Sequence, residues 1–183
     1  MNGLRDYSGE LNPNIKFEDF SKDVLLELLK LYSRLFLAID GFWYLAIKER
    51  GSNEEALLCD IWVWEREVKY EMERLVKLLK IQGSDVIALI KALQISPWIH
   101  NLGYNIEIIN KNDAVLTITR CPTLEALEKE GERREETICK LVEPVIFKKY
   151  AEFFNPNMKV RYLKLPPRRS KEEICCQWEF KVG

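Results

Sequence analysis

The sequence predicts an α+β fold in which helices pack on one face of a four-stranded antiparallel sheet. Apolar residues recur at helical spacing over residues 21–94. Four later segments alternate with a period of two, and they form two neighbouring pairs separated by helical sequence. These patterns predict the order ααα-ββ-αα-ββ. Because the two strands of each pair are close in sequence, we expect them to pair antiparallel. Residues 1–20 are expected to form an N-terminal arm, and residues 21–183 a single α+β domain.

The first two predicted helices form a long hairpin. Ser21 is a suitable N-cap, and the apolar stripe that follows it runs to about residue 49 without changing phase at Asp40-Gly41. The turn Gly51-Ser52-Asn53 then leads into a second helix with its own apolar seam. A third helix is expected over residues 85–94, and a proline follows it closely.

The change from helical to alternating periodicity defines the sheet. The strands are expected over residues 104–109, 114–119, 158–165 and 174–182. Between the two hairpins we predict a helical segment from about residue 123 and a helix over residues 137–154. The last two strands are joined across a loop that contains Pro166-Pro167.

Composition excludes several classes of protein. The chain has 183 residues, 28 basic and 29 acidic side chains and a formal net charge of −1, so nothing draws it to nucleic acid or to an anionic membrane surface. No apolar run approaches the ~18 residues that a membrane span needs. Residues 1–20 lack the apolar core of a signal peptide. We therefore expect a cytoplasmic protein whose thiols stay reduced.

Four of the five cysteines lie in the C-terminal third. Cys121 closes an alternating run, and Cys139 is expected near the start of a helix, whose dipole would favour its thiolate. In the last strand a period of two assigns Cys176 to the core face and Cys175 to the polar face. Cys121, Cys139 and Cys176 are thus the predicted set for a ligand or a divalent metal ion. The alternative is that they are buried as small hydrophobic side chains.

Asp40 and Glu65 are the predicted catalytic carboxylates. Each interrupts an apolar stripe, and the two lie at similar distances from the turn of the hairpin. A partly buried pair of this kind can hold a divalent cation, act as a general base or bind a cationic group. A salt bridge from this pair to Lys48, Arg66 or Lys69 is the alternative.

Aromatic residues crowd the same part of the hairpin. Trp43 and Trp64 are the predicted ligand-binding aromatics, because such side chains line an apolar pocket where the core is incompletely filled. Core packing is the alternative that helical spacing also supports. His100 is the only histidine, which excludes a metal site built from several histidines.

Several short segments resemble an uncharacterised family of prokaryotic cytosolic proteins of unknown function. These segments are Asp40-Gly41-Phe42-Trp43-Tyr44-Leu45-Ala46, Asp60-Ile61, Trp64-Glu65, Arg120-Cys121, Glu125-Ala126, Gly131, Cys139-Lys140-x-Val142, Tyr150-x-x-Phe153 and Cys176-x-Trp178-Glu179-Phe180. The resemblance runs from about residue 20 to the end of the chain. The family is distantly similar to the 2-amino-thiazoline-4-carboxylate hydrolases, and to the vinyl-4-reductase and TRAPP-type ligand-binding domains.

The resemblance implies helices on a four-stranded antiparallel sheet, an apolar cavity or a cysteine-lined site, and a homodimer. This chain departs from the family at Tyr162 and Leu165, where family members tend to carry two further cysteines. A thiolate metal centre would lack those ligands here.

Three functions are consistent with these features. The first is a module that binds a small ligand or a metal ion at a cysteine-containing site between helices and sheet. The second is a metal-assisted hydrolase of a small amide or thiazoline-like ring, with Glu65 or Asp40 as base or metal ligand and a cysteine as ligand or nucleophile. The third is a structural homodimeric subunit without a site.

Overall fold

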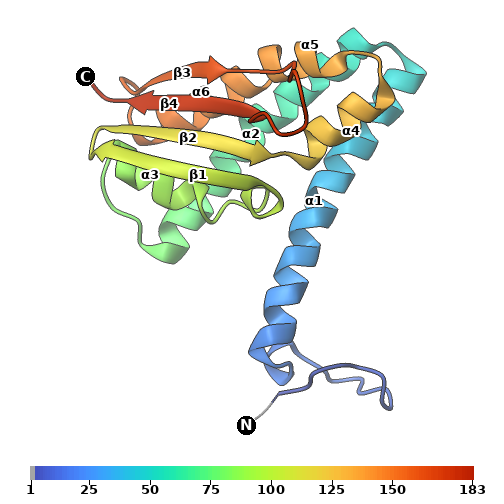
Figure 1. The fold of residues 1–183 in the computed structure, drawn as a ribbon. Helices are drawn as coiled ribbons and strands as arrows, with labels where there is room; N and C mark the ends of the chain where they lie inside the picture. The colour runs from blue at the N-terminus through green and yellow to red at the C-terminus, as the bar shows by residue number, and fades with distance from the viewer. Residues whose placement is uncertain (1–2) are drawn as a thin grey trace.

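The computed structural model describes residues 3–183, and it has the predicted α+β architecture (Figure 1). Residues 1 and 2 of the expected arm lie outside the described residues. In the rest of the arm, a short 3₁₀ helix covers Phe17–Asp19, and a backbone bridge joins Leu4 to Phe20. None of the helices in residues 3–183 is long and apolar enough to cross a membrane.

Two long helices lead the fold. Helix α1 spans Lys22–Arg50 without a break at Gly41, and the Ser21 side chain caps it by accepting a hydrogen bond from the Val24 amide. Helix α2 spans Asn53–Leu79 and is capped in the same way by Ser52. The two helices diverge from their shared turn. Helix α2 passes behind the sheet, whereas the N-terminal half of α1 extends away from it (Figure 1).

The sheet has the strand order β1-β2-β4-β3, and every neighbouring pair is antiparallel. The strands are β1 (Gly103–Asn110), β2 (Asp113–Arg120), β3 (Lys159–Lys164) and β4 (Cys176–Lys181). The two hairpins therefore join through β2 and β4, which puts the C-terminal end of β2 beside the start of β4. In that pair Ile118 stands opposite Cys176.

Helices cover one face of this sheet. Helices α2, α3 (Val86–Leu93) and α6 (Glu143–Phe154) lie behind it, whereas α4 (Pro122–Glu130) and α5 (Arg134–Leu141) lie beyond the end of the sheet where β2 finishes (Figure 1). The core lies between the sheet and the helices behind it, where Trp178 and Phe180 of β4 pack against Phe147 of α6. Cross-strand pairing places Leu116 beside Trp178 on the same covered face.

One predicted helix is divided in the structure. The expected helix over residues 137–154 corresponds to α5 and α6, which meet at Val142. Pro144 lies at the start of α6, and its missing N–H cannot bond to the carbonyl one turn earlier. The helix that carries Cys139 therefore ends at Leu141. It also begins earlier than its periodicity indicates, at Arg134.

Candidate functional site

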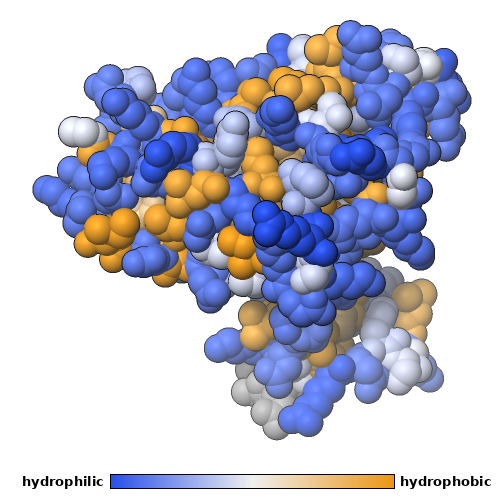
Figure 2. All heavy atoms as spheres, turned by 45° about the horizontal axis from the view of Figure 1, so that its top comes forward, coloured by the Kyte–Doolittle hydropathy of each residue, from blue (hydrophilic) through white to orange (hydrophobic). Residues whose placement is uncertain are grey.

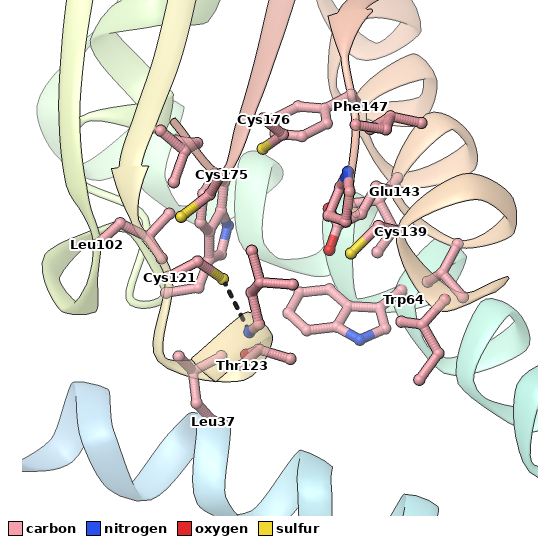
Figure 3. A pocket seen from close by; sticks show the side chains of 18 of the residues that line it. Leu37, Trp64, Leu102, Cys121, Thr123, Cys139, Glu143, Phe147, Cys175 and Cys176 are labelled. Atoms are coloured by element: carbon pink, nitrogen blue, oxygen red, sulfur yellow. Dashed lines mark hydrogen bonds between the residues drawn. The ribbon is translucent and has the colours of Figure 1, made fainter. Parts of the chain in front are cut away.

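A pocket lies where the helices meet the joint between the two hairpins (Figure 3). Its volume is about 120 Å³. The apolar part of its wall comes from Leu37 of α1, Trp64 of α2, Leu102 and Ile118 near the sheet, and Phe147 of α6. The site is thus assembled from segments spread over most of the chain.

The structure brings Cys121, Cys139 and Cys176 to this pocket, and Cys175 lines it as well (Figure 3). Cys121 is the N-cap of α4, directly after β2, and its sulfur accepts a hydrogen bond from the Leu124 amide at 3.4 Å. Cys176 opens β4 on the same sheet face as Trp178, as a period of two predicts. No cysteine forms a disulfide in the described part of the chain.

Two expectations about individual cysteines are wrong. Cys175 does not lie on a polar face, because it is only 1% exposed. Regular alternation begins at Cys176, so it does not extend back to Cys175. Cys139 does not lie at the start of a helix, because α5 ends at Leu141 and places Cys139 near its C-terminal end. The helix dipole there disfavours a thiolate.

Three carboxyl groups line the pocket: Asp40 of α1, Asp60 of α2 and Glu143 of α6. Burial raises the pKa of Asp40 to about 6, and a hydrogen bond from the Trp64 indole opposes part of this rise. Burial and then the charge of Asp40 raise the pKa of Asp60 to about 7. The same two causes raise the pKa of Glu143 to about 7. No lysine, arginine or histidine is among the described residues that line the pocket.

Glu65 does not line this pocket. Its carboxylate lies 3.5 Å from the Lys149 ammonium of α6, so it forms a salt bridge with a residue that the sequence alternatives did not include. Five residues along a helix correspond to a rotation of about 140°, which separates Glu65 from the face that carries Asp60. Asp40 is therefore accompanied by Asp60 instead of Glu65.

Asp60 and Glu143 were absent from the predicted site, although both have a local signal. Asp60 precedes Trp64 by four residues, so the two share a helix face. Glu143 follows Cys139 by four residues in nearly continuous helix. Neither spacing indicates a pocket unless the packing of the helices is known.

The two predicted tryptophans occupy different surroundings. Trp64 is 8% exposed, lines the pocket and packs edge-to-face on Phe36. Trp43 is 68% exposed and lies outside the pocket. It contributes instead to a second, outer groove between α1 and α2, which we call the hairpin groove. Asp40, Asp60 and Trp64 line both spaces.

The thiols of the pocket are held in the protonated form. Burial raises the pKa of Cys121 to about 12. Burial, followed by the charge of Glu143, raises the pKa of both Cys139 and Cys176 well above its usual range. Because the thiolate is the nucleophile and the metal ligand, these cysteines are poorly prepared for either role in the unliganded pocket.

No group of three or more histidine, cysteine, aspartate or glutamate side chains within residues 3–183 is arranged to hold a metal ion. The metal site predicted at Cys121, Cys139 and Cys176 stays a prediction.

The fold and pocket define an α+β domain with an apolar, acidic and thiol-lined cavity between its helices and its sheet. Residues 18–182 match the Family of unknown function (DUF6125), and the chain belongs to this family. Comparison with curated proteins and with solved structures gave no match.

Proposed function

We propose that the protein binds a small molecule with an apolar body and a cationic group, such as an amine, in the pocket between the helices and the sheet. The observation that carries this proposal is that Asp40, Asp60 and Glu143 line one largely apolar cavity without a basic side chain among its described lining residues. Buried carboxyl groups are costly unless they are neutral or paired with a positive charge. A cationic ligand would supply that charge.

The surroundings of the three carboxyl groups support a cation over an anion. The charge of Asp40 raises the pKa of both Asp60 and Glu143, in each case after burial, so the site already carries an excess of negative potential. A bound cation would lower the pKa of each carboxyl group and so favour its charged form. An anionic ligand would add to the repulsion.

The shape of the pocket limits the ligand's size. A cavity of about 120 Å³ is somewhat smaller than the ~150 Å³ cavity that holds benzene in another protein. Trp64, Phe147 and Ile146 offer an apolar wall on which a ring or a short alkyl chain can pack. We therefore expect the buried part of the ligand to be no larger than about one benzene ring.

Ligand-observed NMR with benzylamine, and with benzyl alcohol as its neutral counterpart, tests this proposal. We expect benzylamine to bind and benzyl alcohol to bind at least ten-fold more weakly. Asp60→Asn and Glu143→Gln should each weaken benzylamine binding, whereas Glu73→Gln, on the exposed face of α2, should not. Equal binding of the two probes, or tighter binding of the alcohol, would contradict a cation site.

Metal binding by Cys121, Cys139 and Cys176 is a separate proposal with its own test. Equilibrium dialysis of the reduced protein against Zn²⁺ should give one bound ion if these thiols are ligands. Cys139→Ser should then lower the stoichiometry, while Cys59→Ser on the outer side of α2 should leave it unchanged.

A hydrolase is favoured by one observation, which is that the pKa of Asp60 lies near neutral pH. A general base works best when its pKa is close to the working pH. Nucleophilic attack by a pocket cysteine is disfavoured, because burial raises the pKa of Cys121 to about 12. Turnover of a small amide that survives Cys139→Ser but is lost in Asp60→Asn would support this second candidate.

A further inference from the structure

We propose that the outer face of the α1–α2 hairpin is the surface on which a second copy of this chain packs, and that the second copy closes the hairpin groove. The surface consists of Tyr32, Leu35, Ile39, Phe42 and Trp43 of α1 with Val63 of α2. We call it the hairpin face.

Helix α1 is more exposed to solvent than its apolar composition predicts. Asp40 is its only charged residue between Arg34 and Lys48, and a helix that is apolar on nearly all sides is normally buried. Yet only Ser33 and Tyr44 of its residues are buried. Phe42 and Trp43 are 69% and 68% exposed. A single copy of the chain leaves the most apolar side of this helix in solvent.

The exposed side chains of α1 adjoin α2 at the hairpin groove. Ile39 and Trp43 of α1 and Val63 of α2 line the same hairpin groove, so the apolar faces of the two helices adjoin. A fully exposed aromatic side chain offers about 150–250 Å². The six residues, each 46% to 69% exposed, together amount to roughly 700 Å². A standard protein interface buries about 800 Å² on each partner.

The spacing and charge of α1 favour a second copy as the partner. Tyr32, Leu35, Ile39 and Phe42 follow the alternating three- and four-residue spacing that pairs helices in coiled coils. Such a surface matches itself across a two-fold axis. A net charge of −1 gives two copies little mutual repulsion. A helix that binds a membrane surface carries a strongly basic polar face, whereas α1 mixes five basic with four acidic residues.

Other faces are less suitable. On the side of the molecule that Figure 2 shows, hydrophobic side chains form small separate areas among hydrophilic ones. Ile108 and Ile109, near the turn between β1 and β2, are 46% and 55% exposed, but they are surrounded by the polar residues of that turn.

The hairpin face also bears on the pocket. Asp40, Asp60 and Trp64 form a wall with the pocket on one side and the hairpin groove on the other. A second copy over the groove would shield this wall from water on its outer side. Cys59, which also lines the groove and is half-buried in one copy, would be covered at the same time.

Sedimentation equilibrium of the full chain tests the proposal. The wild type should have twice the mass of one chain, 21.6 kDa. Phe42→Glu combined with Trp43→Glu should give a monomer with an unchanged circular dichroism spectrum, because both side chains are exposed and make no core contact. Iodoacetamide should modify Cys59 at least ten-fold faster in this variant than in the wild type, with the Cys59→Ser protein as the blank.

Ile109→Glu is the matched control, since it places the same charge on an exposed apolar position of the sheet. This variant should remain a dimer. A monomeric wild type at micromolar concentration would overturn the proposal. So would a dimer that survives the double substitution on α1 or dissociates in Ile109→Glu. Binding of the wild type to lipid vesicles with loss of self-association would point to a membrane surface and would also overturn it.

Discussion

The hydroxyl of Tyr150 donates a hydrogen bond to Oε2 of Glu71 at 2.7 Å, and it accepts one from the Trp98 indole at 2.8 Å. This chain of three side chains ties α6 to α2 and to the segment that precedes β1. Tyr150 is fully buried, and Glu71 is 7% exposed. Burial raises the pKa of Glu71, and the hydrogen bond from Tyr150 partly offsets this rise. Trp98 also lines the pocket, so the chain supports one of its walls.

Tyr150→Phe should lower the free energy of unfolding by about 1–3 kcal/mol, because it leaves a buried carboxyl group and a buried indole N–H without their shared partner. Urea denaturation followed by circular dichroism measures the loss. Tyr162→Phe is the matched control, since Tyr162 is 48% exposed, and it should cost less than about 0.5 kcal/mol. Equal losses in the two variants would show that the buried hydrogen bonds add nothing.

Asp60→Asn should change how stability depends on pH. The pKa of Asp60 is about 7 in the folded protein against an ordinary 3.8, so its stabilising contribution is complete below about pH 4 and is lost as the pH rises through 7. At pH 8 the wild type therefore holds a charged Asp60 beside Asp40 and Glu143. We expect the variant to be more stable there by about 1–3 kcal/mol and nearly unchanged at pH 4.5.

Denaturant titrations at a series of pH values measure this effect. Glu73→Gln removes an exposed carboxylate from the same helix and should leave the pH profile of stability unchanged. A wild-type profile that is flat between pH 5 and 8 would contradict the raised pKa of Asp60.

The thiols of Cys121, Cys139 and Cys176 should react slowly in the native protein. Burial raises the pKa of all three, so little thiolate is present at pH 8. In a Cys59→Ser background, we expect a thiol reagent to label these positions at least 100-fold faster in denaturant than in buffer. Peptide mapping by mass spectrometry assigns the sites. Rapid labelling of Cys139 in the native state would restore it as a candidate nucleophile.

Phe147→Ala should destabilise the junction between α6 and the sheet. The Phe147 ring lies 4.6 Å from Trp178, 5.7 Å from Phe180 and 5.9 Å from Trp98, measured between ring centroids. Removing it leaves a cavity next to the pocket and should cost about 3–5 kcal/mol in thermal or chemical unfolding. Phe153→Ala, at a position 36% exposed on the same helix, should cost less than half as much.

The sequence predicts the elements of this fold well because each depends on local pattern. The capping of α1 by Ser21 agrees with prediction, since a cap involves only the next three residues. Alternation in β2 and β4 also predicts which side chains face the helices, including Cys176. The prediction fails at Cys175, where regular strand has not yet begun.

The candidate site is only partly predictable for a different reason. The order of the elements indicates that Cys121 and Cys139 flank the inserted helical segment, but their meeting with Cys176 depends on the pairing of β2 with β4. The order of the elements also does not predict which carboxyl group lies beside Asp40 in the pocket. The expectation of Glu65 rests on its distance from the turn, whereas its helix face directs it to Lys149 of α6.

The amino-acid sequence by itself determines the α+β class and the number of the strands and their order along the chain. Tertiary structure alone decides that Asp60 and Glu143 join Asp40, that Glu65 turns to Lys149, and that Trp43 lies outside the pocket. The physical reason is the distance along the chain over which each interaction acts. Periodicity and caps act within a few residues, whereas the crossing of two helices is set by how their side chains pack on the rest of the molecule.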